Sequence, residues 1–222
     1  MVEAVIFDWD GTLADTKKAV VQSFQKVLTE ERCSVSDEFI ERRMGIGTKK
    51  TIIEAFRKCN MRLDVSTLEK LASEKIRIQA GLTEIVSLFD GVSELLEVLQ
   101  GKTKMALATM SARKVVDNLL SEKRIKTYFD VVVSADEVAN PKPDPEVFLM
   151  AAARLGVDAK DCVVVEDSVF GVRAAKAANM KCIAISSGVY SKEEFQEEHP
   201  DLIVESLREK EKILNFVFST SC

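Results

Sequence analysis

Short, continuous apolar runs recur along the chain and predict buried strands. The five clearest runs are residues 4–7, 104–108, 129–133, 162–165 and 182–185, and a weaker sixth run covers residues 202–204. Because these runs are continuous rather than alternating, we expect both faces of each strand to be covered. That pattern is typical of a parallel sheet enclosed between two layers of helices.

Helical patterns fill most of the gaps between these strands. The expected helices are residues 112–123 with Ser111 as N-cap, a helix that starts with Pro145 after Asp144 as N-cap and ends near Gly156, and a helix that runs from Ser168 as N-cap to Asn179. Alternating strands and helices predict an α/β fold, a doubly wound parallel sheet with right-handed crossovers.

One stretch, residues 16–85, breaks this alternation. It contains no convincing strand and instead shows four amphipathic helical patterns, at residues 16–30, 37–43, 48–59 and 66–81. A block of this length exceeds an ordinary crossover connection. We therefore expect two modules: a Rossmann-like core formed by residues 1–15 and 86–222, and a helical cap formed by residues 16–85 over the end of the first strand.

The composition excludes several classes of protein. The chain has 222 residues, of which 46% are hydrophobic and 30% charged, and no apolar run reaches membrane-spanning length. The net charge of −5, without a basic stripe, disfavours nucleic acid and anionic membranes as partners. The first residues predict a strand rather than a signal peptide. A monomer and a homodimer are both compatible with these features.

The cysteines indicate a reducing compartment. There are five, and none has C-x-x-C spacing, which argues against a disulfide framework and against a zinc site. We therefore expect a cytoplasmic protein.

Candidate chemistry gathers where the predicted strands end, which is where ligands bind in open parallel sheets. The polar residues at these ends are Asp8, Asp10, Thr109, Lys142, Glu166 and Asp167. Four carboxylates at one edge would repel one another unless a cation neutralised them, and Mg²⁺ prefers such hard oxygen ligands. A hydroxyl and a lysine could hold phosphoryl oxygens. The set of side chains therefore suits phosphoryl transfer, in which charge neutralisation and positioning dominate.

Four segments give the chain a close resemblance to the haloacid dehalogenase superfamily, whose members mostly transfer phosphoryl groups. They are Asp8-Trp9-Asp10-Gly11-Thr12, Thr109 after a strand, Lys142-Pro143-Asp144-Pro145, and Glu166-Asp167-Ser168-Val169-Phe170-Gly171-Val172. They occur in the family's order, each at the expected strand end. The helical block resembles the family's cap, inserted after the first motif.

The resemblance implies a role for each motif residue. Asp8 would be the nucleophile and a magnesium ligand, and Asp10 the general acid and base, with its backbone carbonyl on the metal. Thr109 and Lys142 would bind the phosphoryl oxygens, while Lys142 also restrains Asp8. Asp167 would complete the magnesium site, with Glu166 as a direct or water-mediated partner.

Substrate choice is expected to rest with the cap, because it closes over the leaving group. The candidate specificity residues are Gly45, Gly47, Thr48 and Lys49, in a segment whose glycines would let the backbone approach a substrate. An equally weighted interpretation of this segment is a helix–turn–helix corner with solvated basic residues.

Three kinds of relative can be compared within the superfamily. Phosphoglycolate phosphatases resemble the chain in the first motif and in cap size. Beta-phosphoglucomutases share Glu166-Asp167-Ser168 but carry a histidine where this chain has Val20, and a lysine and an arginine where it has Met44 and Thr48. Phosphonoacetaldehyde hydrolases lack the second aspartate, which is Asp10 here, and need a cap lysine at the place of Thr48.

The sequence therefore favours a magnesium-dependent phosphatase acting on a small metabolite, such as phosphoglycolate or a sugar phosphate. Mutase activity, phosphonoacetaldehyde hydrolysis and a non-catalytic binding protein remain the alternatives.

Overall fold

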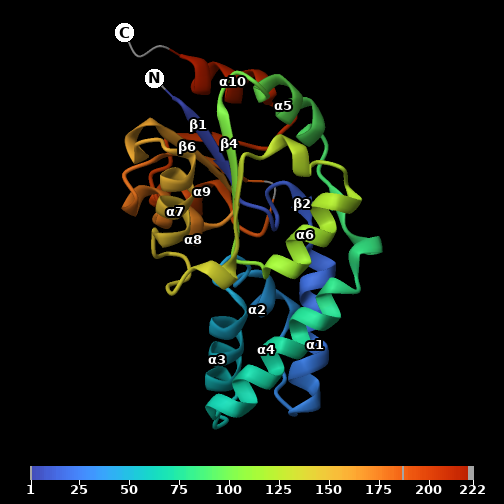
Figure 1. The fold of residues 1–222 in the computed structure, drawn as a ribbon. Coiled ribbons are helices and arrows are strands. Elements are labelled where there is room, and N and C mark those ends of the chain that lie inside the picture. The colour runs from blue at the N-terminus through green and yellow to red at the C-terminus, as the bar shows by residue number, and fades with distance from the viewer. Residues whose placement is uncertain (1, 187, 220–222) are drawn as a thin grey trace.

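A parallel sheet of six strands forms the centre of the protein. The computed structural model describes residues 2–186 and 188–219, and its main sheet has the order β5-β4-β1-β6-β7-β8. The strands are β1 (Ala4–Phe7), β4 (Lys104–Ala108), β5 (Val131–Val133), β6 (Cys162–Glu166), β7 (Lys181–Ile185) and β8 (Leu202–Val204). All neighbours run parallel. Each of the six predicted strands is confirmed, and the fold is the predicted doubly wound α/β arrangement (Figure 1).

Helices cover both faces of this sheet. One face packs against α5 (Val92–Leu99), α6 (Arg113–Glu122) and α10 (Lys210–Phe218), and the other against α7 (Glu146–Leu155), α8 (Val169–Ala177) and α9 (Lys192–Glu197). In β1, Val5 and Phe7 point into the first layer, whereas Ala4 and Ile6 point into the second. This two-sided burial explains why the strands read as continuous apolar runs. The helices predicted from the sequence do not include α5 or α10.

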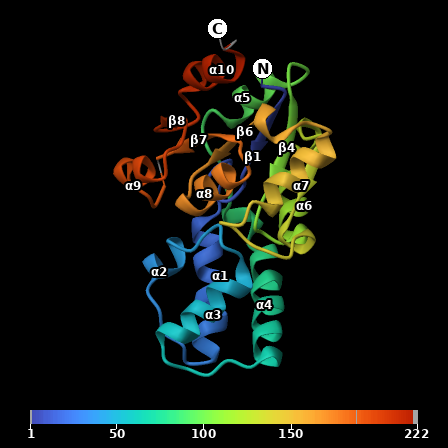
Figure 2. The same cartoon turned by 90° about the vertical axis from the view of Figure 1, so that its left-hand side faces the viewer.

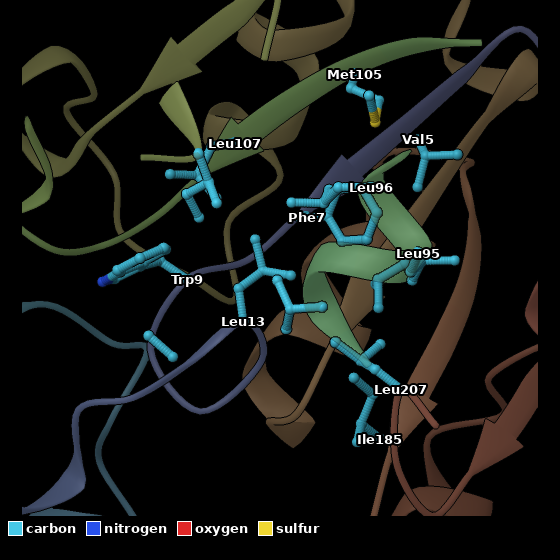
Figure 3. Close-up of a cluster of buried hydrophobic side chains, with 14 of the residues drawn as sticks. Val5, Phe7, Trp9, Leu13, Leu95, Leu96, Met105, Leu107, Ile185 and Leu207 are labelled. Atoms are coloured by element: carbon cyan, nitrogen blue, oxygen red, sulfur yellow. The ribbon is translucent and has the colours of Figure 1, made fainter. Parts of the chain in front are cut away.

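The apolar cluster between β1 and α5 extends to the start of the cap. Figure 3 shows Phe7 and Leu13 beside Leu95 and Leu96, with Trp9 at the edge of the cluster. Trp9 is fully buried in this cluster. Its indole nitrogen has no hydrogen-bond partner in the described part of the chain.

Two of the three predicted helix caps hold, wholly or in part. Ser168 accepts a hydrogen bond from the backbone N–H of Gly171 at the start of α8. Asp144 accepts one from the N–H of Glu146, although α7 begins one residue later than expected.

The Ser111 prediction is wrong. The N-cap of α6 is Ala112, and the N–H of Arg113 donates instead to Asp136 from a neighbouring loop. Ser111 is therefore released for another contact, described below.

Four helices form a separate layer at one end of the sheet: α1 (Lys17–Glu30), α2 (Asp37–Glu41), α3 (Thr48–Lys58) and α4 (Val65–Ala80). They enclose an apolar cluster of their own, and Figure 2 shows α1, α3 and α4 beneath the carboxyl ends of the strands. A short antiparallel pair, β2 (Ala14–Asp15) with β3 (Ser87–Leu88), carries the chain into this layer and back. The module boundaries expected from the sequence, after residue 15 and after residue 85, lie next to this pair of strands, and the division into two modules stays a prediction.

The strand register sets the position of the candidate site. Phe7 at the end of β1 lies beside Leu107 of β4 and Val165 of β6, so the residues that follow the three strands emerge together. After β1 the chain adds β4 and β5 on one side of that strand and then β6, β7 and β8 on its other side, and such a switch point is where ligands bind in this class of fold. None of the helices in the described ranges has the length and apolar character needed to cross a membrane.

Candidate active site

Asp8 and Lys142 form a buried ion pair at the end of β1. The Asp8 N–H donates to the carbonyl of Val165, which fixes the backbone where the strand ends. Lys142 Nζ lies 2.5 Å from Asp8 Oδ1 and 2.7 Å from Glu166 Oε1, and the lysine is fully buried. A buried ammonium needs such partners, because an unpaired charge in the interior costs several kilocalories per mole.

Glu166 is held from several directions at once. Its Oε2 accepts hydrogen bonds from the backbone N–H groups of Asp167 and Ser168, both at 2.9 Å, and from the Ser168 hydroxyl. A Cβ at Gly171 would lie 1.8 Å from this carboxylate, so only glycine leaves it room. One carboxylate oxygen of Glu166 contacts Lys142 and the other accepts hydrogen bonds from the turn after β6, so Glu166 positions both.

Asp167 completes a group of three carboxylates. The Thr12 hydroxyl donates to its Oδ1 at 3.0 Å. Gly11 has φ +87°, and a Cβ there would lie 2.0 Å from Asp167 Oδ2. The turn after β1 therefore requires glycine at this position for two reasons, its backbone conformation and the lack of space for a side chain. Carboxylate oxygens of Asp8, Glu166 and Asp167 lie within 4.8 Å of one another.

The charges of this group are not balanced by protein alone. Burial raises the pKa of Asp8 to about 8 despite the nearby Lys142, and burial followed by repulsion from Glu166 and Asp8 raises the pKa of Asp167. Burial acts to lower the pKa of Lys142, but attraction to Asp8 and Glu166 outweighs it and the pKa is raised. One ammonium thus faces three carboxylates, and a donor set made only of oxygens fits a hard divalent cation such as Mg²⁺.

Asp10 points toward a different set of partners. Its Oδ1 accepts a hydrogen bond from Thr16 at 2.7 Å, and its Oδ2 accepts one from the Ser111 hydroxyl at 2.6 Å and a longer one from Thr109 at 3.4 Å. Thr109 is fully buried and its hydroxyl accepts from the Ser111 N–H. Asp10 is therefore placed beside the predicted phosphate-binding threonine and next to the entrance of the cap. Sequence reasoning missed Ser111 as its partner.

The cap approaches the core through the loop between α2 and α3. A Cβ at Gly45 would lie 3.2 Å from Ser168 Oγ, and one at Gly47 would lie 3.7 Å from Pro141. Gly45, Gly47 and Thr48 line a cavity of about 30 Å³ that also includes Asp10. Lys49 does not line it, because its ammonium turns outward to Glu69 at 2.6 Å.

Lys75 is the second site lysine, and the sequence patterns did not single it out. It lines the same cavity as Asp10, is 4% exposed, and donates to the side-chain carbonyl of Gln79. Its ammonium lies 4.4 Å from the centre of the Phe24 ring. Burial lowers its pKa to about 8, an effect that Asp10 partly opposes.

A signal for Lys75 exists in the sequence. Leu71, Lys75 and Gln79 are spaced four apart, so the lysine falls on the buried stripe of α4 rather than on its solvated face. A charged residue on an apolar stripe needs a partner or a function.

Comparisons with known proteins agree with this geometry. The family described as haloacid dehalogenase-like hydrolase matches residues 5–185. The chain is 33% identical over 184 residues to the phosphorylated carbohydrates phosphatase of Thermotoga maritima, covering 82% of this chain and 84% of that protein. It is 33% identical over 183 residues to the fructose-1-phosphate phosphatase YqaB of Escherichia coli, covering 82% and 95%. A hydrolase from Pseudomonas syringae has the same fold, with a TM-score of 0.90 at 24% identity over 98% and 100% of the two chains.

Proposed function

Because this chain belongs to the haloacid dehalogenase-like hydrolase family, we propose that it is a magnesium-dependent phosphatase that works through an aspartyl-phosphate on Asp8. Its substrate is a small phosphorylated metabolite of the phosphoglycolate or sugar-phosphate kind. One observation carries this proposal: Asp8 lies in a three-carboxylate cluster with Lys142 at 2.5 Å, beside an acid–base candidate, Asp10, anchored to Thr109 and Ser111.

Mg²⁺ would be held by Asp8, Asp167 and the backbone carbonyl of Asp10, with Glu166 as a direct or water-mediated partner. When bound, it neutralises the carboxylates and the phosphoryl oxygens, so that an anionic nucleophile can approach an anionic substrate. Lys142 restrains Asp8 and, together with the Thr109 hydroxyl, binds phosphoryl oxygens as charge shifts onto them.

In the first half-reaction, a carboxylate oxygen of Asp8 attacks phosphorus and the bond from phosphorus to the ester oxygen breaks. Asp10 gives its proton to the departing oxygen, so the leaving group departs as a neutral alcohol. In the second, Asp10 takes a proton from water, whose oxygen attacks the phosphorus. The bond to Asp8 breaks, inorganic phosphate leaves, and both carboxyl groups return to their starting states.

The cap must open to admit substrate. A cavity of about 30 Å³ holds little more than a water molecule, whereas ligand sites commonly need about 300 Å³ or more. We therefore interpret the described arrangement as a closed form, with β2 and β3 as the connection about which the cap would move. In the closed form, Lys75 supplies a positive charge to the leaving group, while Val20, Phe24 and Met44 limit its size.

The cavity wall also bears on the mutase alternative. Val20 lies in this wall, at the position where the mutases carry a histidine, and it offers no polar atom to a sugar. In a phosphatase, water accepts the phosphoryl group from the aspartyl-phosphate. This reaction therefore needs no polar side chain at position 20 to hold a sugar.

The test is a screen of phosphorylated metabolites with the full chain, with and without Mg²⁺, following phosphate release. We expect release from a few small monoesters only with Mg²⁺, and none from an Asp8→Asn variant. Conversion of beta-glucose 1-phosphate to the 6-phosphate without phosphate release would favour the mutase instead. An absence of Mg²⁺-dependent turnover on every substrate would favour a binding protein.

A further inference from the structure

Two thiols meet inside the cap, away from the candidate active site. Cys33 follows the end of α1 and Cys59 is the C-cap of α3, and their Sγ atoms lie 3.2 Å apart. The Cys59 Sγ also donates to the carbonyl of Ser34 at 3.3 Å, so its side chain is directed toward the segment that carries Cys33. No function described above uses either residue.

The backbone around both thiols is fixed. The Cys33 N–H donates to the carbonyl of Leu28 at 2.9 Å, and the Cys59 N–H donates to that of Ala55 at 3.0 Å. Each cysteine is thus tied to the last turn of its own helix, and both residues pack in or against the cap's apolar cluster. The two sulfur atoms therefore meet where the chain leaves α1 and α3, in segments whose backbone is hydrogen-bonded to the ends of those helices.

The two thiols differ in access to solvent. Cys33 is fully buried, and Cys59 is half-buried. The other described cysteines, Cys162 and Cys182, are buried in the sheet, where Cys162 Sγ donates to the carbonyl of Asp158. Cys222 lies outside the described residues. Of the described cysteines, Cys59 is therefore the one that a solvent-borne reagent reaches first, with Cys33 directly behind it.

We propose that Cys33 and Cys59 are a redox modification site that forms a reversible disulfide by exchange with a low-molecular-weight disulfide. The Cys59 thiolate attacks one sulfur of the reagent, whose S–S bond breaks and releases one thiolate. Cys33, after losing its proton to water, then attacks Cys59 Sγ and expels the second thiolate. The two protein thiols are thus oxidised to one disulfide, and the reagent disulfide is reduced to two thiols. The two protons that the protein thiols lose are taken up by these two product thiols.

Burial sets the order of these steps. It raises the pKa of Cys33 to about 12, with the contact to Cys59 adding to the effect, so Cys33 stays protonated at neutral pH. The thiolate is the attacking form, so Cys33 is not the residue that starts the reaction. Its contact with Cys59 Sγ, and not its acidity, allows it to close the bond once it loses its proton. The rate of closure is expected to rise with pH for the same reason.

The disulfide would cross-link the part of the cap that lies next to the candidate active site. The cysteines are 26 positions apart, and the segment between them contains α2, the loop with Gly45 and Gly47, and α3. A cross-link over this span removes freedom from the unfolded chain and raises thermal stability. The oxidised cap would therefore unfold at a higher temperature than the reduced cap.

The experiment equilibrates the full chain in glutathione buffers of increasing oxidised fraction, blocks free thiols with an alkylating reagent, and maps the peptides by mass spectrometry. We expect a linked Cys33–Cys59 peptide that lacks two hydrogen atoms, its reversal by excess reduced dithiothreitol, and a Tm several degrees higher in the oxidised form. Cys162→Ser should retain both the link and the Tm rise, and Cys59→Ser should lose both.

Three results would overturn the proposal. One is that Cys33 and Cys59 remain free thiols in the most oxidising buffer. Another is that Cys59 stops at the mixed disulfide with glutathione. The third is that it pairs with Cys222 instead. Because Cys59 is half-buried, Cys59→Ser should fold, and its circular dichroism and reduced-state Tm establish this before the comparison is made.

Discussion

Lys142 Nζ lies 2.5 Å from Asp8 Oδ1, although 134 positions separate the two residues in the chain. The lysine is fully buried and its other carboxylate partner is Glu166. This single ammonium thus joins the end of β1 to the end of β6 by pairing with a carboxylate from each. The contact connects the fold to the proposed chemistry, because it places Asp8, the proposed nucleophile, beside a positive charge.

Removing this ammonium should affect both stability and catalysis. We expect Lys142→Ala to lower the free energy of unfolding by about 3 kcal/mol, since it leaves buried charge uncompensated. We expect kcat/KM to fall by about 100-fold or more, since a donor to the phosphoryl group is lost. Chemical denaturation and steady-state kinetics measure the two effects.

The matched control is Lys160→Ala, whose ammonium is exposed and lies 3.6 Å from an equally exposed Asp158. It should change neither quantity appreciably. If Lys142→Ala behaved like this control, the lysine would have no part in the site.

A second ion pair spans the boundary between cap and core. The Arg42 guanidinium lies 2.5 Å from Glu194 and 4.9 Å from the centre of the Tyr190 ring, and the Tyr190 hydroxyl donates to the Arg42 carbonyl. These contacts join the cap to the core in the described arrangement, and a movement of the cap away from the core would break them. We expect Arg42→Ala to favour the open form and to raise KM about two- to five-fold, which corresponds to the modest energy of a half-exposed pair.

A double-mutant cycle with Glu194→Ala isolates the pair, and a coupling of about 0.5–1 kcal/mol in kcat/KM is expected. Arg173→Ala is the control, because its partner Glu198 also belongs to the core. Strictly additive effects of the Arg42 and Glu194 substitutions would show that the pair does not hold the cap.

Lys75 should give the enzyme a pH dependence of substrate binding. Its pKa is lowered to about 8 by burial, with Asp10 acting in the opposite direction. Above that pH the ammonium loses its proton and its attraction for an anionic substrate. We expect KM to rise as pH increases through about 8, and Lys75→Met to have a raised KM that lacks this dependence.

The same group should affect folding with a definite sign. Its folded pKa lies below the ordinary 10.5, so between about 8 and 10.5 the unfolded chain binds more protons than the folded chain. The contribution of Lys75 to the free energy of unfolding therefore rises with pH across that window. Lys75→Met should lose this slope and be more stable than the parent at pH 7. A variant with an unchanged slope would contradict the assignment.

Ser111 should assist Asp10 as a positioning residue. Its hydroxyl donates to Asp10 Oδ2 at 2.6 Å. We expect Ser111→Ala to reduce kcat about 5- to 10-fold, the equivalent of one hydrogen bond, and to shift the pH profile of kcat. Ser111→Thr, which keeps the hydroxyl, should restore much of the rate, and Ser121→Ala on the exposed side of α6 should have no effect. Equal kinetics in Ser111→Ala and the parent would remove this role.

Much of the core could be predicted because its signals are local. Strands buried on both faces require continuous apolar runs, and parallel strands in register bring their following residues to one edge. Asp8, Thr109 and Asp167 therefore meet where the runs end. Lys142 could be placed through the motif around it, even though its complete burial is not visible in local sequence.

The remaining features depend on distant packing. Ser111 looks like a helix cap, but Asp136 takes that role from another loop and frees the hydroxyl for Asp10. Lys75 falls on the buried stripe of α4, but only the docking of α4 near Asp10, which no local pattern shows, places it in the candidate site. The pair between Arg42 and Glu194 joins segments 152 positions apart, for which no local pattern exists.

The most direct test of the account is to trap the phosphoryl group on the protein. An Asp10→Asn variant with Mg²⁺ and p-nitrophenyl phosphate, whose leaving group departs without needing a proton, should accumulate the covalent form, because hydrolysis of the intermediate lacks its base. Acid quenching and peptide mass spectrometry should then find one phosphoryl group on Asp8. A phosphoryl group on another residue, or none on Asp8 while substrate is consumed, would contradict the account.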